Sequence, residues 1–494
     1  MIFDPAAPPE GTIRDWIDAR AEAGGTAFVF PDSDPLSWDA LRVQVRDMAE
    51  GLIGHGVRKG ESLAIIHPNG RDGILALFAA LYAGCRATMI NLAAGPDAIA
   101  YALEHSGARF AFVHADQMET LARIAPEGLT ALTSKHLIQK ADLPDLTPDD
   151  HALLMYTSGT TGKPKGVVHS QSSLLAGGWT TAVAHALTAQ DRACCVLPIY
   201  HINGLCVSLM GTLVSGGSAL ILPKFSASRF WDQADAAQIT WFSVVPTIIS
   251  HLLHGEADPK PITRARLRFG RSASSALAVE TQAAFESRFG VPIIETMGLT
   301  ETAAQILSNP LPPGVRKIGS PGVGFGCEVR ILAPDISEAP YGIEGEIAVR
   351  GPNVMREYLH NPDATAATFA GDWLRTGDLG RMDADGYVFV TGRLKELIIK
   401  GGENIAPREI DEVLYSHADV IEAAAFARAC PQYGERVEVA LALRDGSALS
   451  ADDVIALCHA RLGPFKSPDR VHFMAELPKG PSGKIQRLKL AELV

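Results

Sequence analysis

The sequence predicts an α/β protein with a large N-terminal body of mixed and parallel sheets layered with helices, including a β-barrel-like portion, and a small α+β lid at the C-terminus. Two observations support this prediction. Apolar β-branched runs alternate with segments rich in alanine and leucine through most of the body, which is typical of βαβ units. The chain of 494 residues is also too long for one compact core. We expect a body of residues 1–392 and a lid of residues 393–494.

The alternation begins with a strand, a helix and a second strand. SLAIIHP at 62–68 predicts a buried strand, GILALFAALYAG at 73–84 predicts a helix, and RATMIN at 86–91 predicts the next strand. Further strands are expected at 193–197 and 217–222. Strands separated by helices in this way favour a largely parallel sheet.

Later segments follow a different pattern. GEIAVRG at 345–351 and DGYVFVTG at 385–392 predict short strands joined by turns, in an antiparallel or barrel-like portion. In the lid, APREIDEVLYSH at 406–417 predicts a helix and EVALAL at 438–443 predicts a strand. The lid ends in a basic segment, PKGPSGKIQRLKL.

Composition limits the classes of function. A net charge of −12 argues against a nucleic-acid surface, although local basic pockets for anions are still allowed. The longest nearly apolar run, 74–85, is shorter than the ~20 residues needed to cross a bilayer. The start, MIFDPAAPPEG, has no secretion-signal pattern, and the seven cysteines have no metal-ligand spacing. We expect a cytoplasmic monomer or homodimer with no membrane or nucleic-acid partner.

YTSGTTGKPKG at 156–166 combines small residues and hydroxyls with two lysines. Small residues let backbone amides approach an anion, hydroxyls donate further hydrogen bonds, and lysine adds charge, so the stretch predicts a phosphate-binding loop. It differs from the P-loop because Gly162-Lys163 is followed by Pro164, where that motif needs serine or threonine. A flexible linker is the alternative.

Four further segments accompany this loop in a fixed order. They are PIYHINGL (198–205, with His201), ETMGLTETA (295–303, with Thr300 and Glu301), RTGDLG (375–380, with Asp378) and PKGPSGKIQR (478–487, with Lys484). Together the five segments resemble the adenylate-forming superfamily of acyl-CoA synthetases, adenylation domains and luciferases, over nearly the whole chain. The nearest resemblance is to the branch that activates small dicarboxylates such as oxalate.

The resemblance implies an enzyme that uses ATP, Mg²⁺ and coenzyme A. A carboxylate would attack the α-phosphate of ATP to give an acyl-adenylate, and a thiol would then form the thioester. Glu301 would bind Mg²⁺, Thr300 the α-phosphate, Asp378 the ribose and Arg393 the nucleotide. The phosphate loop would comprise Thr157, Ser158, Gly159, Thr160, Thr161 and Lys165, and the adenine side would comprise Ser272, Ala273, Ser274, Thr296, Met297 and Gly298. Met297 departs from the family, which commonly has an aromatic residue there to stack on adenine.

The resemblance also implies a mobile lid. Lys484 would neutralise charge that develops on the α-phosphate and the attacking carboxylate. The lid would then rotate about a hinge at Lys395 and bring Gly401 and Gly402 to the site, where they allow close approach of a pantetheine arm. Taken alone, Lys484 would be interpreted as a surface lysine and Asp378 as a turn cap.

The acceptor is expected to be coenzyme A, because the residues after Gly483 leave no room for a carrier-protein domain. His201 stands where amino-acid-activating domains have an aspartate, so such a domain is a weaker alternative. A binding protein that has lost catalysis is disfavoured because Glu301 and Lys484 are both present.

The candidate wall of the acid pocket includes two side chains that can carry positive charge. The expected wall residues are His201, Trp241, Val245, Pro246 and Arg271, with the segment Ala303-Ala304-Gln305. An arginine inside a fatty-acid tunnel would lack a partner, so Arg271 favours a small polar acid, dicarboxylate or sulfonated, over an aryl or fatty acid. The alternative is that Arg271 turns away and pairs with a structural carboxylate.

Overall fold

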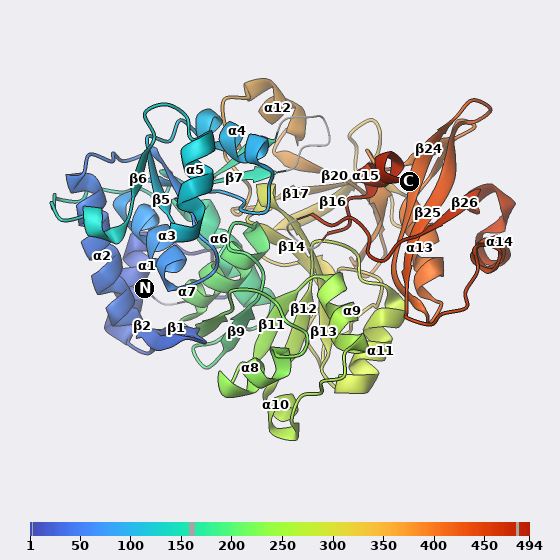
Figure 1. Cartoon of the computed structure of the whole chain (residues 1–494), viewed down its shortest axis with the longest axis horizontal. Helices are drawn as coiled ribbons and strands as arrows, with labels where there is room; N and C mark the ends of the chain where they lie inside the picture. Colours follow the sequence, from blue (N-terminus) through green and yellow to red (C-terminus); the bar gives the residue numbers. More distant parts are fainter. Residues whose placement is uncertain (2, 158–163, 481–483) are drawn as a thin grey trace.

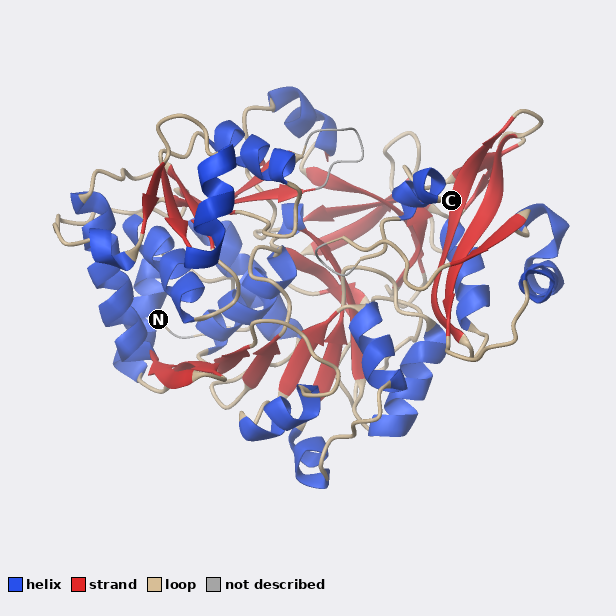
Figure 2. Cartoon of the chain, in the orientation of Figure 1, coloured by secondary structure: helices blue, strands red, loops and turns tan. Residues whose placement is uncertain are grey.

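The computed structural model describes residue 1 and residues 3–157, 164–480 and 484–494 (Figure 1). Three sheets and most of the helices form a large body, and a fourth sheet with its own helices forms a small C-terminal domain (Figures 1 and 2). The predicted α/β architecture with a separate small lid is therefore confirmed. No helix in the described parts of the chain is both long and apolar enough to span a membrane.

The first body sheet has nine strands and is mostly parallel. In spatial order these are β15 (Val323–Gly324), β14 (Ala304–Ser308), β13 (Ile293–Leu299), β12 (Phe269–Ser272), β11 (Trp241–Val244), β9 (Arg192–Cys195), β10 (Ser218–Ile221), β1 (Thr26–Phe30) and β2 (Ser33–Ser37). From β13 to β1 every neighbouring pair is parallel. The strands expected at 193–197 and 217–222 correspond to β9 and β10.

The second body sheet has seven strands. In spatial order these are β18 (Glu357–Tyr358), β8 (Lys165–Ser170), β7 (His151–Thr157), β4 (Arg86–Met89), β3 (Ser62–Ile66), β5 (Phe110–Val113) and β6 (Thr130–Leu132). β3, β4 and the helix between them, α3 (Arg71–Ala83), confirm the first three predicted elements.

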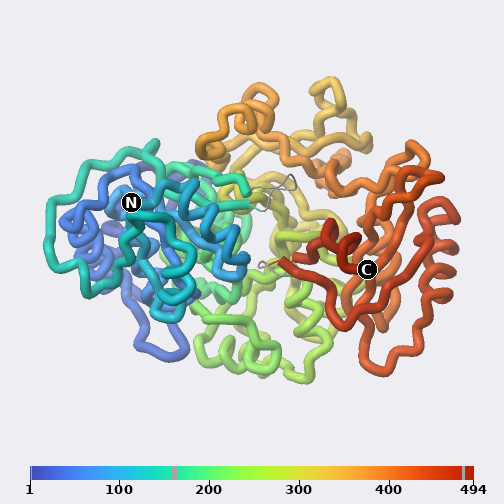
Figure 3. Tube along the Cα trace, turned by 45° about the horizontal axis from the view of Figure 1, so that its top comes forward, coloured from blue at the N-terminus to red at the C-terminus, as the bar shows by residue number. Residues whose placement is uncertain are grey.

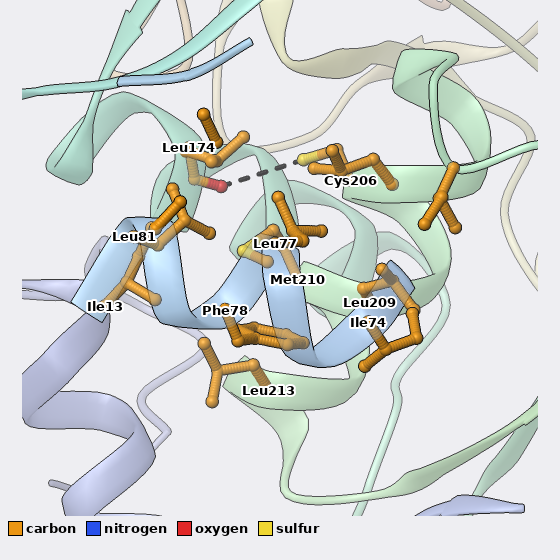
Figure 4. Packing of buried hydrophobic residues seen from close by; sticks show 14 of the residues in the cluster. Ile13, Ile74, Leu77, Phe78, Leu81, Leu174, Cys206, Leu209, Met210 and Leu213 are labelled. Atoms are coloured by element: carbon orange, nitrogen blue, oxygen red, sulfur yellow. Dashed lines mark hydrogen bonds between the residues drawn. The ribbon is translucent and has the colours of Figure 1, made fainter. Parts of the chain in front are cut away.

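Helices between the two sheets form the main core. α3 packs there with α6 (Gln171–Ala184), the π-helix η3 (Asn203–Met210) and α7 (Gly211–Ser215), as Figure 4 shows for Leu77, Leu174 and Met210. Every residue of α3 from Gly73 onward is buried, which explains why its sequence has no polar face. The remaining helices of the body are α1 (Ile13–Ala23), α2 (Trp38–Gly54), α4 (Pro96–Ser106), α5 (Met118–Ile124), α8 (Phe230–Ala236), α9 (Pro246–His254), α10 (Pro261–Arg266), α11 (Val279–Phe289) and α12 (Pro362–Thr368).

The antiparallel portion predicted from the segments 345–351 and 385–392 is also present. Its sheet is formed by β16 (Glu328–Leu332), β17 (Gly345–Arg350), β20 (Trp373–Met382), β19 (Phe369–Ala370) and β21 (Val388–Arg393). Arg393 pairs with Asp378 in the register of β21 and β20, so this residue still belongs to a body sheet. The exact division at 392 and 393 remains a prediction.

The C-terminal domain has a core of its own, which includes Ile398, Ile410 and Val439. Its elements are β22 (Ile398–Lys400), β23 (Glu403–Ile405), α13 (Pro407–Tyr415), β24 (Val420–Cys430), β25 (Gly434–Leu443), α14 (Ala451–Lys466), β26 (Arg470–Phe473) and α15 (Arg487–Leu493). β25 begins four residues before the apolar run 438–443, because its charged first half pairs with the end of β24 in a hairpin. Figure 3 shows the final segment of the chain, in red, extending from this domain toward the body.

Close packing at Gly177 of α6 positions the turn that follows Glu301. A Cβ atom at residue 177 would lie 2.4 Å from the Ala303 carbonyl oxygen and 2.7 Å from Cys206 Sγ. Contacts this short cannot be accommodated without moving the backbone. The absence of a side chain therefore lets α6, η3 and the Ala303 turn approach one another.

We expect Gly177→Ala to lower the free energy of unfolding by about 1–3 kcal/mol, because the added methyl group overpacks this junction. Gly211→Ala is the matched control, since the nearest atom to its Cβ would be in the Thr181 side chain, at 3.5 Å, which is an ordinary van der Waals contact. The thermal unfolding midpoints of both variants and the wild type would be compared. Equal midpoints for the two variants would contradict the packing argument.

Candidate nucleotide and acid site

A cleft between the body and the C-terminal domain brings together many of the residues predicted for nucleotide binding. Those that line it are Ser274, Thr296, Met297, Gly298, Asp378, Arg393 and Lys484. Ser274 follows β12, and Thr296 to Gly298 belong to β13, so this part of the cleft lies at the carboxyl end of neighbouring parallel strands. Ligands of open α/β sheets bind at this edge.

Ser272 and Ala273 lie behind the lining. Both are buried, and Ser272 Oγ has no hydrogen-bond partner among the described residues. Ser274 has a positive φ of 75°, which turns the chain at the edge of the cleft.

The turn at Thr300 and Glu301 is held by three contacts to its backbone carbonyl oxygens. His169 Nε2 lies 2.7 Å from the Thr300 carbonyl oxygen, Met355 N donates to the Glu301 carbonyl at 2.8 Å, and Asn353 Nδ2 donates to the Thr302 carbonyl at 2.8 Å. Burial lowers the pKa of His169 to about 4, so the ring is neutral and can donate one hydrogen bond. The carboxylate of Glu301 is thus presented from a fixed backbone.

The Glu301 carboxylate fits a hard divalent cation. It is half-buried, it accepts a hydrogen bond from the Tyr358 hydroxyl at 2.8 Å, and no cationic group of the described residues lies within ion-pair distance. No three His, Cys, Asp or Glu side chains in the described ranges gather to hold a metal by themselves. One carboxylate supplemented by substrate phosphates is a usual arrangement for Mg²⁺.

The segment predicted to be the phosphate loop lies between β7 and β8 in the sequence. Thr157 and Lys165 are opposite each other in the register of these strands. Lys165 Nζ lies 4.3 Å from the centre of the Tyr358 ring. The predicted residues Ser158, Gly159, Thr160 and Thr161 lie outside the described residues.

Two charged groups from the body meet Lys484 at the cleft. Arg393 Nε pairs closely with Asp378 Oδ1, and Arg393 Nη2 lies 3.4 Å from Asp378 Oδ2. Burial lowers the pKa of the Lys484 ammonium, and the positive charge of Arg393 lowers it further. An anion placed between Lys484 and Arg393 would relieve this repulsion.

Sequence reasoning missed the residues that support Lys484. Arg487 Nη2 pairs with Asp411 Oδ2 at 2.5 Å, and Arg487 Nε lies 3.3 Å from Glu396 Oε2. This buried pair fastens the segment that carries Lys484 to α13. Because Asp411 is remote from residue 487 in sequence, no local pattern indicated the contact.

Glu295 and Arg408 are two further cleft residues without a predicted role. Glu295 is buried, its Oε2 has no partner among the described residues, and burial raises its pKa. Arg408 reaches across from α13 and donates to the Val390 carbonyl at 2.7 Å. Glu295 is the first residue of the segment ETMGLTETA, and this position was the only sequence feature that could have indicated a place in the site.

The predicted hinge and pantetheine loop lie apart from the cleft lining. Lys395 is exposed in the turn after β21. Gly401 and Gly402 are exposed, with φ values of 61° and 89° that favour glycine. In this arrangement of the lid, Lys484 and not the glycine loop faces the site.

Arg271 occupies an unusual environment behind the cleft. Only 1% of its surface is exposed, and it donates to Gln305 Oε1 at 3.1 Å, Asn203 Oδ1 at 3.0 Å and Ser243 Oγ at 3.0 Å. Burial lowers its pKa to about 9. Within the described residues no carboxylate lies within 4.0 Å of it, so the expected alternative of a structural ion pair is not supported.

The other expected wall residues are buried or half-buried. Trp241 is buried in a stack with Phe269, at 5.4 Å between ring centres, and therefore belongs to the core. Val245 precedes α9 and is buried, as is Ala303, whose φ is 45°. His201 lies half-buried in the turn before η3. Asn203 links Arg271 to the cleft, because its Oδ1 accepts from Arg271 and its Nδ2 donates to Ser274 Oγ at 3.3 Å.

Comparisons with known proteins identify relatives that are CoA ligases. The chain is 44% identical over 477 residues to a protein named sulfoacetate–CoA ligase from Cupriavidus necator, and the match covers 93% of each. It is 34% identical over 493 residues to an oxalate–CoA ligase from Arabidopsis thaliana, covering 94% of this chain and 96% of the relative.

A solved structure supports the same conclusion. The o-succinylbenzoate coenzyme A synthetase of Bacillus subtilis, in complex with ATP and magnesium ion, has a TM-score of 0.86 and 30% identity, covering 98% of this chain and 100% of that one. The family of AMP-binding enzymes matches residues 16–359, and the AMP-binding enzyme C-terminal domain matches residues 409–484. The chain therefore belongs to the AMP-binding enzyme family, as an AMP-forming acyl-CoA ligase that uses ATP, Mg²⁺ and coenzyme A.

Proposed function

We propose that this ligase activates a small carboxylic acid that carries a second anionic group, and that it acts in the cytoplasm as a monomer or homodimer. The observation that carries the substrate proposal is Arg271, a buried guanidinium held only by neutral acceptors. Burying a charge without a counter-charge costs several kcal/mol, and a second anionic group on the substrate would offset this cost.

The position of Arg271 suits a short acid. Arg271 is joined to the cleft-lining Ser274 through Asn203, by hydrogen bonds of 3.0 and 3.3 Å. An acid with its reactive carboxylate at the α-phosphate would direct its other end toward this group. The names of the two relatives, sulfoacetate–CoA ligase and oxalate–CoA ligase, refer to acids with two anionic groups and support the proposal.

Each half-reaction then has its own group of side chains. In the first, Glu301 would hold Mg²⁺ on the phosphates, Lys165 and the phosphate loop would bind the phosphates, and Lys484 would neutralise charge on the α-phosphate and the attacking carboxylate. Bound Mg²⁺ would neutralise phosphate charge. In the second, the lid would rotate about Lys395. This rotation would move Lys484 out of the cleft and bring Gly401 and Gly402 toward the pantetheine arm.

Arg271→Met should reduce kcat/KM for doubly charged acids by at least about 30-fold, because removing one partner of a buried charge pair costs about 2 kcal/mol or more. The measurement compares pyrophosphate release with oxalate, malonate, sulfoacetate, benzoate and octanoate. Arg268→Met is the matched control, since Arg268 already pairs with Asp191 at 2.6 Å. A wild-type preference for benzoate or octanoate would contradict the proposal and indicate an aryl- or fatty-acid ligase.

Lys484→Ala should slow adenylate formation on the order of 10²–10³-fold, corresponding to about 3 to 4 kcal/mol of lost transition-state stabilisation. Thioester formation from supplied acyl-adenylate should be much less affected. Lys479→Ala serves as the control, because Lys479 pairs with Glu422 and Glu476 away from the cleft lining. Equal losses in both half-reactions would indicate a folding role for Lys484.

Lys395→Pro should affect the two half-reactions unequally, because proline fixes φ and restricts rotation of the lid. Adenylate formation and thioester formation would be timed separately in this variant and in Lys395→Ala, which keeps the backbone free to rotate. Unchanged turnover in the proline variant would show that the pivot lies elsewhere.

A further inference from the structure

Tyr358 joins two parts of the site that are distant in sequence. It lies in β18, a two-residue strand that pairs antiparallel with β8, with Tyr358 opposite Val167. Two more backbone bonds extend this pairing: Leu359 N donates to the Gly166 carbonyl at 2.8 Å, and Arg356 N donates to the Val168 carbonyl at 2.9 Å. The backbone of Tyr358 is therefore fixed to the strand that leaves the phosphate loop.

The side chain of Tyr358 contacts both a carboxylate and an ammonium. Its hydroxyl donates to Glu301 Oε1 at 2.8 Å, and the Lys165 Nζ atom lies 4.3 Å from the centre of its ring. The residue is only 6% exposed, so both contacts are shielded from water. One side chain thus orients the proposed metal ligand and also holds the lysine of the phosphate loop.

The chemistry of the phenol suits this task. A phenol is ordinarily protonated near neutral pH, so the Tyr358 hydroxyl is a neutral donor to the Glu301 carboxylate. A neutral donor fixes one oxygen of the carboxylate and leaves its negative charge in place. A lysine or arginine would neutralise that charge. The other oxygen of Glu301 retains its full capacity for a cation.

We propose that Tyr358 is a positioning residue that aims the Glu301 carboxylate at the divalent cation and aligns it with Lys165 beside the phosphates. This inference rests on the proposed role of Glu301 in binding Mg²⁺. The competing explanation is packing alone, because the ring also belongs to a core cluster with Val167 and Ile347. The two explanations differ in what the hydroxyl contributes.

Tyr358→Phe separates them, because it keeps the ring and removes the donor. Mn²⁺ binding in the presence of ATP and without any acid would be measured by electron paramagnetic resonance, together with thermal unfolding. We expect Mn²⁺ affinity to fall about tenfold or more, the usual effect of losing a hydrogen-bond partner of a metal ligand, with little change in the unfolding midpoint. Tyr358→Leu should in addition bind ATP more weakly than Tyr358→Phe does, because the contact of the ring with Lys165 is also lost.

Tyr387→Phe is a closely matched control. The Tyr387 hydroxyl donates to the Val315 carbonyl at 2.7 Å, and Lys317 Nζ lies 4.5 Å from its ring centre, but no predicted site residue is involved. This variant should bind Mn²⁺ as the wild type does. In a Glu301→Gln background, Tyr358→Phe should cause little additional loss, because the hydroxyl acts through the carboxylate.

Four outcomes would decide the matter. Equal Mn²⁺ affinity in Tyr358→Phe and the wild type would overturn the positioning role, as would an equal loss in Tyr387→Phe. A lowered unfolding midpoint with unchanged Mn²⁺ affinity would also overturn it and leave packing as the role of Tyr358. Wild-type protein that binds no Mn²⁺ with ATP would instead refute the metal site itself.

Discussion

Charge without a counter-charge is the constraint on which the site depends. Some structural charges in this protein are paired, as Arg487 is with Asp411, whereas others bind neutral acceptors, as the part-buried Arg192 binds Ser218 and the Ala237 carbonyl. Arg271 and Glu301 have no ion-pair partner among the described residues, and Arg271 is almost completely buried. Neutral donors and acceptors hold both groups in place and leave their charges available. For the buried Arg271 this arrangement is costly in the empty protein, and an anionic ligand would offset that cost on binding.

Close packing keeps these charges in position. The turn that carries Glu301 is fixed on one side by α6, where Gly177 admits the Ala303 carbonyl, and on the other by the segment before Tyr358. The body can therefore keep the Glu301 carboxylate in a fixed position without a second charged residue. Rigid support of this kind is what an electrostatic catalyst needs, because a group that moves must be reordered during the reaction.

The lid works under a different requirement. In the proposed mechanism its contribution, Lys484, would have to reach the cleft in one half-reaction and leave it in the other. The pair of Arg487 and Asp411 lies within the lid and could travel with it, whereas the bonds from Arg408 to the Val390 and Gly319 carbonyls cross to the body and would have to break. Two hydrogen bonds from one arginine to backbone carbonyls are a modest barrier to such a movement.

The sequence alone determined the alternation of strands and helices, the antiparallel portion, the small lid and the order of the five segments, because these depend on local periodicity and on residues adjacent in the chain. It located β25 incompletely, since the charged half of that strand is stabilised by its partner β24 and not by burial. Only the tertiary structure decided that Arg271 has neutral neighbours and that Tyr358 reaches Glu301, 57 residues away in sequence. The physical reason is that side-chain pairing and desolvation are set by which distant segments pack together, and no local pattern in the sequence records this.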